Sequence, residues 1–350
     1  MSKTILTIVI PSYNMEKYLD RCLSSLIIDP EQMLQFEAII VNDGSKDRTS
    51  EIGHEYESKY PGTFRVIDKM NGHYGSCVNA GLAQAQGKYI KVLDADDYFE
   101  TGFSKYLSFL ENTDADLILT NSISIDEYGS ERAKTSFPLP AFESIGINRL
   151  LENRIVHLDH FNISWKTGIL RAMAYRQTEG ISYTDLEWST LPTERISSIT
   201  YCPETVYCYL RGRAGQSVDI EYRKKNMWME NKVVLGIAVQ YEAIKDKLAQ
   251  GNASFMKELT SFLIRQIYFH YLINFPHDLD ESGLVSFDNN LFNTSKELYT
   301  SVSDTVDVRK FGTFHYIRDF RKKKTRKTLK YALFDACVAI GSWGRKVNHG

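Results

Sequence analysis

Short apolar runs alternate with helically spaced apolar positions from the start of the chain to about residue 120. The runs are rich in Val and Ile and end at turn-forming residues, which is typical of buried strands. Five strands are predicted in this way, at residues 7–10, 36–41, 64–67, 88–93 and 116–120. Strands that are joined through helices need crossover connections. The pattern therefore predicts an α/β fold with a mostly parallel sheet flanked by helices.

The intervening helices have their own signals. Positions 19, 22, 23, 26 and 27 are apolar, which is the spacing of one helix face. A polar helix is expected after the second strand, with Asp47 or Thr49 as its cap. A third helix is expected at about 76–86, ended by Gly87.

Three polar loops follow the ends of predicted strands, at residues 11–14, 42–45 and 94–97. Ligands of open α/β sheets bind beyond the carboxyl ends of the strands. Because all three loops fall at those ends, the sequence predicts one site at this edge of the sheet.

The loop at 94–97 reads Asp-Ala-Asp-Asp. Carboxylates crowded together repel one another unless a cation or hydrogen-bond donors offset them. In an extended segment Asp94 and Asp96 would point to the same side, where their oxygens suit Mn²⁺ or Mg²⁺. Taken by itself, the tetrapeptide is equally compatible with surface acids that cap the next helix.

Bulk properties narrow the class of protein. The 350 residues have a formal net charge of −2, so no general affinity for nucleic acid is expected. The first ten residues are interpreted as a strand and not as a signal peptide, and no apolar run is long enough to span a bilayer. The five cysteines lack metal-type pairing, and free thiols in a reducing cytosol account for them.

The domain organisation is predicted from a change of pattern. Residues 121–217 are mixed, whereas the chain turns helical beyond about 225. We expect a catalytic domain at 1–220, with a nucleotide-binding half at 1–120 and an acceptor-side half at 121–220. A mainly helical region should follow at 221–350, as a membrane-surface or oligomerisation segment.

Ordered motif blocks in the first hundred residues resemble glycosyltransferase family 2, the inverting enzymes with the GT-A nucleotide-diphospho-sugar fold. The blocks are IVIPSYN at 8–14, IIVNDGSKD at 39–47, NG at 71–72, NAG at 79–81, GKYI at 87–90 and LDADD at 93–97. A weaker resemblance continues through YTDLEW at 183–188 and RGRAGQSV at 211–218. Those later blocks are similar to bacterial enzymes that build surface polysaccharides or decorate wall polymers.

The resemblance implies roles for the residues of the donor side. Asp96 would bind the metal, Asp94 would share it or contact the ribose, and Asp97 would cap the next helix or orient the site. Asp43 would accept the N3–H of uracil, although an Asp-Gly-Ser turn also explains it. The further donor contacts implied are Pro11 and Tyr13 at the base and ribose, Asn71 and Ala95, and Arg211 and Ser217 at the diphosphate, with a flexible basic hairpin as the alternative for the last two.

The chain departs from the family pattern at two places. The family's arginine before Asn79 is absent, and Lys69 or a later arginine could replace it, while a direct role for His73 stays open. The family's Glu-Asp pair is Thr184-Asp185 here. Asp185 is the candidate catalytic base, Glu187 is its rival, and an ordinary helix start is the alternative.

The C-terminal segment 318–330 is rich in Lys and Arg and is followed by apolar and aromatic residues. This pattern suits a helix on an anionic membrane surface, and equally a solvated charge run beside a packed helix. RNA binding is a distant third interpretation.

The resemblance implies a cytoplasmic, metal-dependent inverting hexosyl- or N-acetylhexosaminyltransferase, acting near the inner face of the membrane. A nucleotide-sugar, most simply a UDP-sugar, would be the donor, and a glycan or lipid-linked oligosaccharide would be the acceptor in surface-polysaccharide synthesis. The alternative is a non-catalytic sugar-nucleotide-binding or scaffolding protein, and a homo-oligomer stays open. Nucleotidyltransferases and processive synthases fit less well, since their characteristic blocks are missing.

Overall fold

The computed structural model describes residues 4–213, 216, 219–275, 278–303, 307–309, 312–326 and 331. Contacts divide the chain into two units. The first comprises Met1–Arg223 with Ile244–Leu259, and the second comprises Lys224–Ala243 with Thr260–Gly350. The predicted division into domains at residue 220 stays a prediction. The two units do not meet at one boundary, because Ile244–Leu259 belongs to the first unit.

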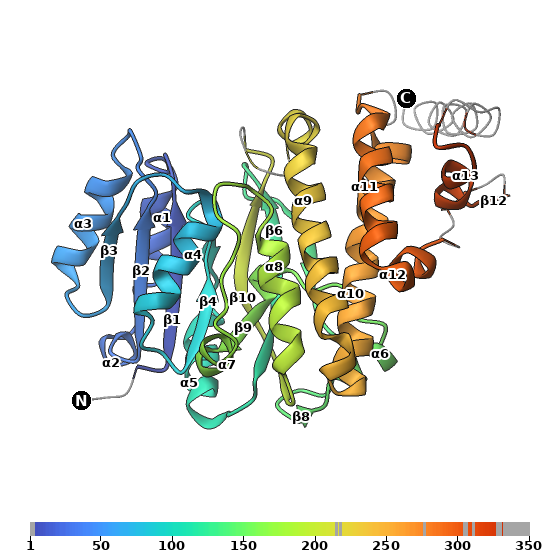
Figure 1. The fold of residues 1–350 in the computed structure, drawn as a ribbon. Helices are drawn as coiled ribbons and strands as arrows, with labels where there is room; N and C mark the ends of the chain where they lie inside the picture. The colour runs from blue at the N-terminus through green and yellow to red at the C-terminus, as the bar shows by residue number, and fades with distance from the viewer. Residues whose placement is uncertain are drawn as a thin grey trace, which may run out of the picture. The chain divides into compact units, whose positions relative to one another are not determined.

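The first unit is built on a mixed sheet whose N-terminal part is parallel (Figure 1). The strand order here is β3-β2-β1-β4, and the register pairs Ser12 at the end of β1 with Asn42 at the end of β2. The strand ends are therefore level at one edge of the sheet. These strands are β1 (Leu6–Ser12), β2 (Phe36–Asn42), β3 (Phe64–Asp68) and β4 (Tyr89–Val92).

Most of the remaining strands come from the mixed stretch at 121–217, while the predicted strand at 116–120 is confirmed as the start of β6. The order continues β4-β9-β6-β10-β5; β9 is antiparallel to β4 and β6, while β6 and β10 are parallel. The sheet is thus less parallel than expected, but the predicted α/β class is confirmed. The strands are β5 (Tyr98–Phe99), β6 (Leu117–Asp126), β9 (Ile163–Lys166) and β10 (Ile199–Arg211), with β7 (Glu131–Thr135) and β8 (Ser144–Ile145) at the margins.

Alternation along the strands creates two cores, one on each face of the sheet. In β1, Ile8 and Ile10 face one core and Val9 faces the other. The first core is covered by α1 (Leu19–Ser24), α2 (Pro30–Met33), α3 (Thr49–Lys59) and α5 (Phe103–Asn112). The second is covered by α4 (His73–Gln84), α6 (Asn148–Glu152), α7 (Thr167–Ala172) and α8 (Asp185–Thr190), together with the 3₁₀ segment Leu191–Arg195. Phe161, in the 3₁₀ segment His160–Asn162, packs against the first core.

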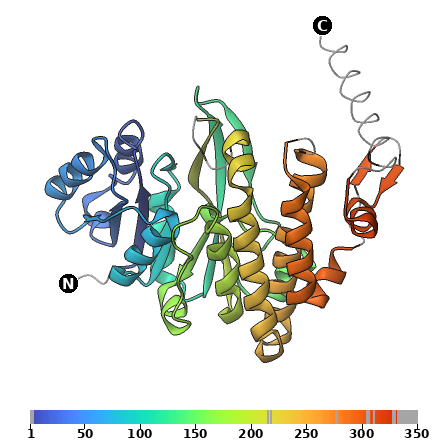
Figure 2. The same ribbon diagram turned by 45° about the horizontal axis from the view of Figure 1, so that its top comes forward.

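The second unit is mainly helical, as predicted (Figure 2). Two long helices, α9 (Ile220–Ile244) and α10 (Gln250–Phe269), contribute residues to both units. A π-helical turn continues α10 at His270–Asn274. The remaining elements are α11 (Glu281–Thr294), α12 (Lys296–Ser301), the hairpin β11 (Asp307–Arg309) and β12 (Gly312–Phe314), and α13 (Tyr316–Lys323).

Part of the predicted basic segment is folded into this unit. Arg321 pairs with the fully buried Asp288 at 2.9 Å, Lys324 pairs with the same carboxylate, and Arg326 donates to the carbonyl of Leu272. These three cations therefore stabilise the unit and are not offered to a membrane, whereas Arg318, Lys322 and Lys323 are exposed. Residues 327–330 and 332–340 of the predicted segment lie outside the described residues. No helix in the described part of the chain combines the length and apolar composition needed to cross a bilayer.

The close packing of α4 on β1 can be tested with Gly81→Ala. A Cβ at this position would lie 2.5 Å from Cγ1 of Val9, so the helix must shift. We expect the free energy of unfolding to fall by about 1–3 kcal/mol in chemical denaturation. Gly168→Ala in α7 is the matched control, because its Cβ would meet nothing within 4 Å. Equal behaviour of the two variants would contradict this packing.

Candidate active site

The loops that follow β1 and β2 are joined by hydrogen bonds at the edge of the sheet. The backbone amide of Asn14 donates to Oγ of Ser45 at 3.0 Å, and Oδ1 of Asn14 accepts from the amide of Lys46 at 2.8 Å. Asn14 has a positive φ of 55°, a conformation that Asn tolerates better than most residues. The structure thus brings two of the three predicted loops together.

Asp43 is buried at the end of β2 and is held in a fixed orientation. Its Oδ1 accepts from Nζ of Lys69 at 2.6 Å and from the amide of Gly72 at 2.9 Å. The side chain of Asn71 donates to the carbonyl of Asp43 at 3.0 Å. Lys69 also donates to Oγ of Ser76 in α4, so its cation lies beside the N-terminus of that helix.

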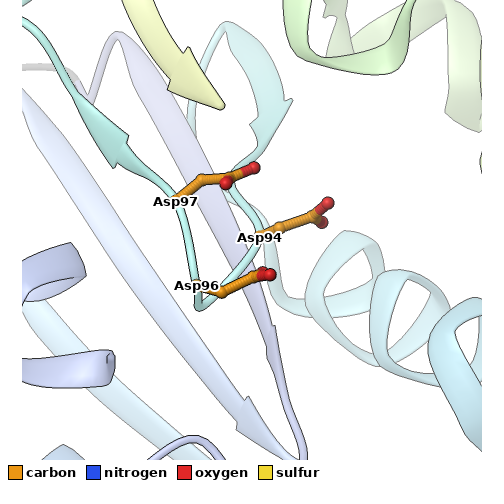
Figure 3. Close-up of side chains that lie close together, drawn as sticks. All are labelled: Asp94, Asp96 and Asp97. Carbon is orange, nitrogen blue, oxygen red and sulfur yellow. The ribbon is translucent and has the colours of Figure 1, made fainter. Parts of the chain in front are cut away.

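The acidic segment forms a turn instead of continuing the strand. The amide of Asp97 donates to the carbonyl of Asp94 at 2.9 Å, and Figure 3 shows all three carboxylates directed to one side of the turn. One oxygen from each of Asp94, Asp96 and Asp97 can be chosen so that the three lie within 4.8 Å of one another. The acids therefore converge, but through a turn and not through the strand alternation that the sequence suggested.

Asp96 is paired with a residue from the loop that follows β10. Its Oδ2 accepts from Nε of Arg213 at 2.5 Å and from Nε2 of Gln216 at 3.1 Å. Gln216 is itself fixed by the carbonyl of Leu210 and the amide of Gly212. Arg213 and Gln216 of the RGRAGQS block are thus adjacent to the acidic turn.

Asp97 has a structural role that the sequence did not predict. Its carboxylate accepts from Oη of Tyr207 and from the amide of Leu210, both at 2.7 Å. Burial raises the pKa of Asp97 well above its ordinary value, and the charges of Asp96 and Asp94 raise it further. The helix-cap interpretation is wrong, since α5 begins at Phe103 and its N-cap is Gly102. Asp97 instead anchors β10 beneath the turn.

A histidine lies between the acidic turn and α8. Nε2 of His160 is 3.1 Å from Oδ2 of Asp94, and its Nδ1 is 3.8 Å from Oδ2 of Asp185. Burial opposes protonation of His160, but Asp94, Asp185 and Asp159 raise its pKa to about 9. The ring therefore carries both protons at neutral pH, and a single cationic side chain faces both carboxylates.

The same contact governs the charge of Asp94. Burial would raise the pKa of this carboxyl, but the charge and hydrogen bond of His160 outweigh it, with help from Tyr74 and Arg213, and the pKa lies below its ordinary value. Asp94 is therefore ionised at neutral pH. Burial and the nearby Asp94 raise the pKa of Asp185, although His160 and Arg223 oppose this shift.

The donor set of the acidic turn fits a divalent cation. Oδ1 of Asp94 and Oη of Tyr74 are buried neighbours, and Tyr74 favours the ionised form of Asp94, but neither atom makes a hydrogen bond of ordinary geometry with any described atom. A buried carboxylate oxygen without a well-aligned donor is stabilised when a cation occupies its lone pair. Asp94 and Asp96 could hold Mn²⁺ or Mg²⁺, which prefer carboxylate oxygens.

Asp185 and Glu187 both lie on α8 but have different surroundings. Oε2 and Oε1 of Glu187 accept from the amide and the hydroxyl of Thr178, both at 2.7 Å. Asp185 faces His160 instead. Thr184 is the N-cap of α8 by position, yet its hydroxyl donates to Gln177 and makes no cap hydrogen bond. The predicted helix start at Thr184-Asp185 is therefore confirmed, although the side chain of Thr184 does not cap it.

The other predicted residues are placed as follows. Pro11 is the penultimate residue of β1, and Tyr13 follows the strand with 45% of its surface exposed. Ala95 is buried within the acidic turn, and Arg211 is exposed with its guanidinium over the ring of Tyr209. His73 is partly buried at the start of α4 with a positive φ of 64°. Ser217 lies outside the described residues.

Three residues of the site escaped the sequence interpretation. They are Tyr74, His160 and Tyr207. His160 and Tyr207 come from the mixed stretch between 121 and 217, where no periodicity placed them. Tyr74 stands inside a predicted loop, next to His73, and the residue type alone gave no reason to choose between the two.

A mixed sheet flanked by helices, with an acidic turn at the end of one of its strands, is typical of the GT-A class of nucleotide-diphospho-sugar transferases. Residues 7–176 match the model of the family described as glycosyl transferase family 2. The chain is also 30% identical over 237 residues to the uncharacterized glycosyltransferase MG025 of Mycoplasma genitalium, an alignment that covers 65% of this chain and 76% of the relative. The chain belongs to glycosyltransferase family 2.

A second relative has a named activity. The chain is 22% identical over 262 residues to the poly(ribitol-phosphate) β-N-acetylglucosaminyltransferase TarS of Staphylococcus aureus, covering 73% of this chain and 44% of TarS. The crystal structure of TarS residues 1–349 superposes with a TM-score of 0.64 at 20% identity, covering 85% of this chain and 83% of that one. A complex of the same fragment with UDP-GlcNAc gives a TM-score of 0.60 at 19% identity, covering 84% and 83%. This likeness confirms the predicted GT-A fold.

Tyr207→Phe tests how far the acidic turn depends on β10. The hydroxyl donates to Asp97 and accepts from the amide of Asp94 at 3.1 Å, so its removal leaves two buried groups without this partner. We expect a loss of about 1–3 kcal/mol in the free energy of unfolding, measured by urea denaturation. Tyr128→Phe is the control, because Tyr128 is 92% exposed. An unchanged midpoint for Tyr207→Phe would show that the turn does not rely on this hydroxyl.

Proposed function

We propose that this glycosyltransferase transfers a sugar from a UDP-sugar to a hydroxyl with inversion, in a metal-dependent reaction. The observation that carries the proposal is the line Asp94–His160–Asp185, which places a carboxylate from α8 beside the acidic turn. Such a transfer needs carboxylates that hold a metal ion beside the leaving diphosphate. It also needs a base that takes the proton of the acceptor hydroxyl.

Asp94 and Asp96 would hold the ion on the donor side. The chemistry that Mn²⁺ or Mg²⁺ supplies there is charge neutralisation on the departing diphosphate. Arg213 and Arg211 would add cationic contacts to the diphosphate oxygens, since Arg213 already borders Asp96 and Arg211 ends β10 two residues earlier. The backbone amides at the start of α4, with Lys69 beside them, suit a phosphate as well.

The uracil specificity is assigned to Asp43. Oδ1 of Asp43 accepts the hydrogen bonds from Lys69 and Gly72, and Oδ2 would accept a hydrogen bond from the N3–H of uracil. Lys69 and Gly72 hold the carboxylate so that this acceptor has one orientation. Pro11 and Tyr13 would line the base and ribose, and Asn71 and Ala95 would complete the donor contacts.

Asp185 is assigned the role of base. It would take the proton of the acceptor hydroxyl while the acceptor oxygen forms a bond to the anomeric carbon and the bond from that carbon to the diphosphate breaks. Attack from the opposite face would convert an α-linked donor into a β-linked product, with UDP as the leaving group. Burial raises the pKa of both Asp185 and Glu187, but both oxygens of Glu187 are occupied by Thr178, whereas Asp185 faces His160.

The named activity of TarS suggests a first substrate class to test. UDP-N-acetylglucosamine is the donor that we would try first, with polyol-phosphate and glycan acceptors. A lipid-linked acceptor would suit a cytoplasmic enzyme that works near the inner face of a membrane. The second candidate function is that of a non-catalytic protein that binds sugar-nucleotides. The missing family glutamate and arginine favour that alternative, while the intact Asp94–His160–Asp185 line favours the enzyme.

Asp185→Asn and Glu187→Gln separate the candidate base from its neighbour. We expect Asp185→Asn to lower kcat for transfer from UDP-GlcNAc by about 10²–10⁴-fold, because the proton acceptor is lost. Glu187→Gln should retain most of kcat and lose stability, since it only holds Thr178. The kcat of each variant is obtained from UDP release measured with and without acceptor. If Glu187→Gln lost more of its kcat than Asp185→Asn, Asp185 would be excluded as the base.

Asp96→Asn tests the metal site without relying on turnover. In the wild type, UDP with Mn²⁺ should raise the Tm well above UDP alone, because a ligand that binds only the folded state stabilises it. Asp96→Asn should lose most of this extra shift, whereas Asp114→Asn at an exposed ion pair should retain it. A full Mn²⁺-dependent shift in Asp96→Asn would rule out Asp96 as a ligand.

A further inference from the structure

His160 stands in the 3₁₀ segment before β9, and its two ring nitrogens face carboxylates from different elements. The ring nitrogens of His54 also face two carboxylates, but His54 is half exposed whereas His160 is largely buried. We propose that His160 is a positioning residue that fixes Asp94 on the donor side through Nε2 and Asp185 on the acceptor side through Nδ1. This inference rests on the proposed function, because it assigns these two carboxylates to metal and base.

The ring of His160 is held in one orientation by aromatic side chains. Tyr74, Phe161 and Tyr207 approach it in edge-to-face geometry, with centroid distances of 6.3, 5.3 and 6.5 Å. Interplanar angles of 75–82° show that none of them stacks flat on the imidazole. Only 13% of the His160 side chain is exposed. A ring enclosed in this way has little freedom to turn, so both of its nitrogens point where the enclosure directs them.

The backbone that carries His160 is anchored from the core. Nζ of Lys91 in β4, a fully buried side chain, donates to the carbonyl of Phe161 at 2.7 Å and to that of Ile163 at 3.2 Å. Burying an amine is costly unless its hydrogen bonds are satisfied. Here the amine ties the segment next to His160 to the strand that leads into the acidic turn.

On the donor side, the bond from Nε2 determines which oxygen of Asp94 faces the site. His160 occupies Oδ2, while Oδ1 is the buried oxygen that makes no hydrogen bond of ordinary geometry. Without this bond the carboxylate could rotate and present either oxygen. Partners that orient a metal-binding side chain change metal affinity by about 10–100-fold.

On the acceptor side, the contact is a close polar approach and not a direct hydrogen bond. The distance between Nδ1 of His160 and Oδ2 of Asp185 is 3.8 Å, which exceeds hydrogen-bond length. Asp185 is the N-terminal residue of α8 and has 37% of its side chain exposed. The enclosed ring of His160 therefore borders the carboxylate of Asp185 and limits the positions that this carboxylate can take beside the acidic turn.

Two conservative variants separate the two contacts. The side-chain amide of Gln reaches the position of Nε2, and that of Asn corresponds to Nδ1. We expect His160→Gln to keep its Mn²⁺ affinity within about 3-fold of wild type, measured by electron paramagnetic resonance with UDP present, while kcat for UDP-GlcNAc hydrolysis falls about 10–100-fold. His160→Asn should weaken Mn²⁺ binding about 10-fold or more, and at saturating Mn²⁺ its kcat should exceed that of His160→Gln.

The controls distinguish positioning from a general loss of structure. His160→Ala should lose both properties, and His157→Gln, at an exposed histidine of the same loop, should lose neither. If both properties fall together in every His160 variant, in step with Tm, or if all variants match the wild type, the proposal is overturned. A wild type that turns over no sugar-nucleotide would refute the proposed function instead, and the Mn²⁺ affinities would still test the contact with Asp94.

Discussion

Three carboxylates within 4.8 Å of one another are the constraint on which the rest of the site depends. At an effective dielectric constant near 20, two unit charges this close repel by several kcal/mol, so each acid must be compensated separately. The structure solves this in three ways. Asp94 is paired with His160, Asp96 with Arg213, and Asp97 accepts two hydrogen bonds from β10 while burial raises its pKa. Two acids therefore stay ionised beside cations, and the third is held where a proton is favoured.

Because each acid is compensated by a different partner, the acidic turn contacts residues from distant parts of the chain. His160 precedes β9, whereas Tyr207 and Leu210 belong to β10, and both strands lie in the half of the sheet that mixes directions. The loop after β10 supplies Arg213 and Gln216. Residues beyond 121 are thus tied to the first 120 residues through the acids themselves.

The parts that the sequence could predict are those determined by local pattern. The alternation of apolar runs and helical spacing placed the first four strands, and the short motif blocks placed Asp43 and Asp94 at strand ends. What it could not predict were contacts between residues far apart in the chain, such as His160 with Asp94. Even the correct convergence of Asp94 and Asp96 was expected for a wrong reason, since a turn, not a pleated strand, brings them together. Tertiary pairing leaves no periodic trace in a single sequence, so His160 and Tyr207 were not predicted.

The replacement of the family's glutamate by Thr184 is consistent with the same charge logic. An acid at that place would add another negative charge next to Asp185, which already faces Asp94. Thr184 is buried and satisfies its hydroxyl on Gln177, so the position contributes a neutral hydrogen bond. His160 then supplies the positive charge that two neighbouring carboxylates require, and Glu187 is withdrawn onto Thr178. In this arrangement the lost glutamate does not imply a lost base, because the remaining aspartate keeps both an opposing charge and access to the acidic turn.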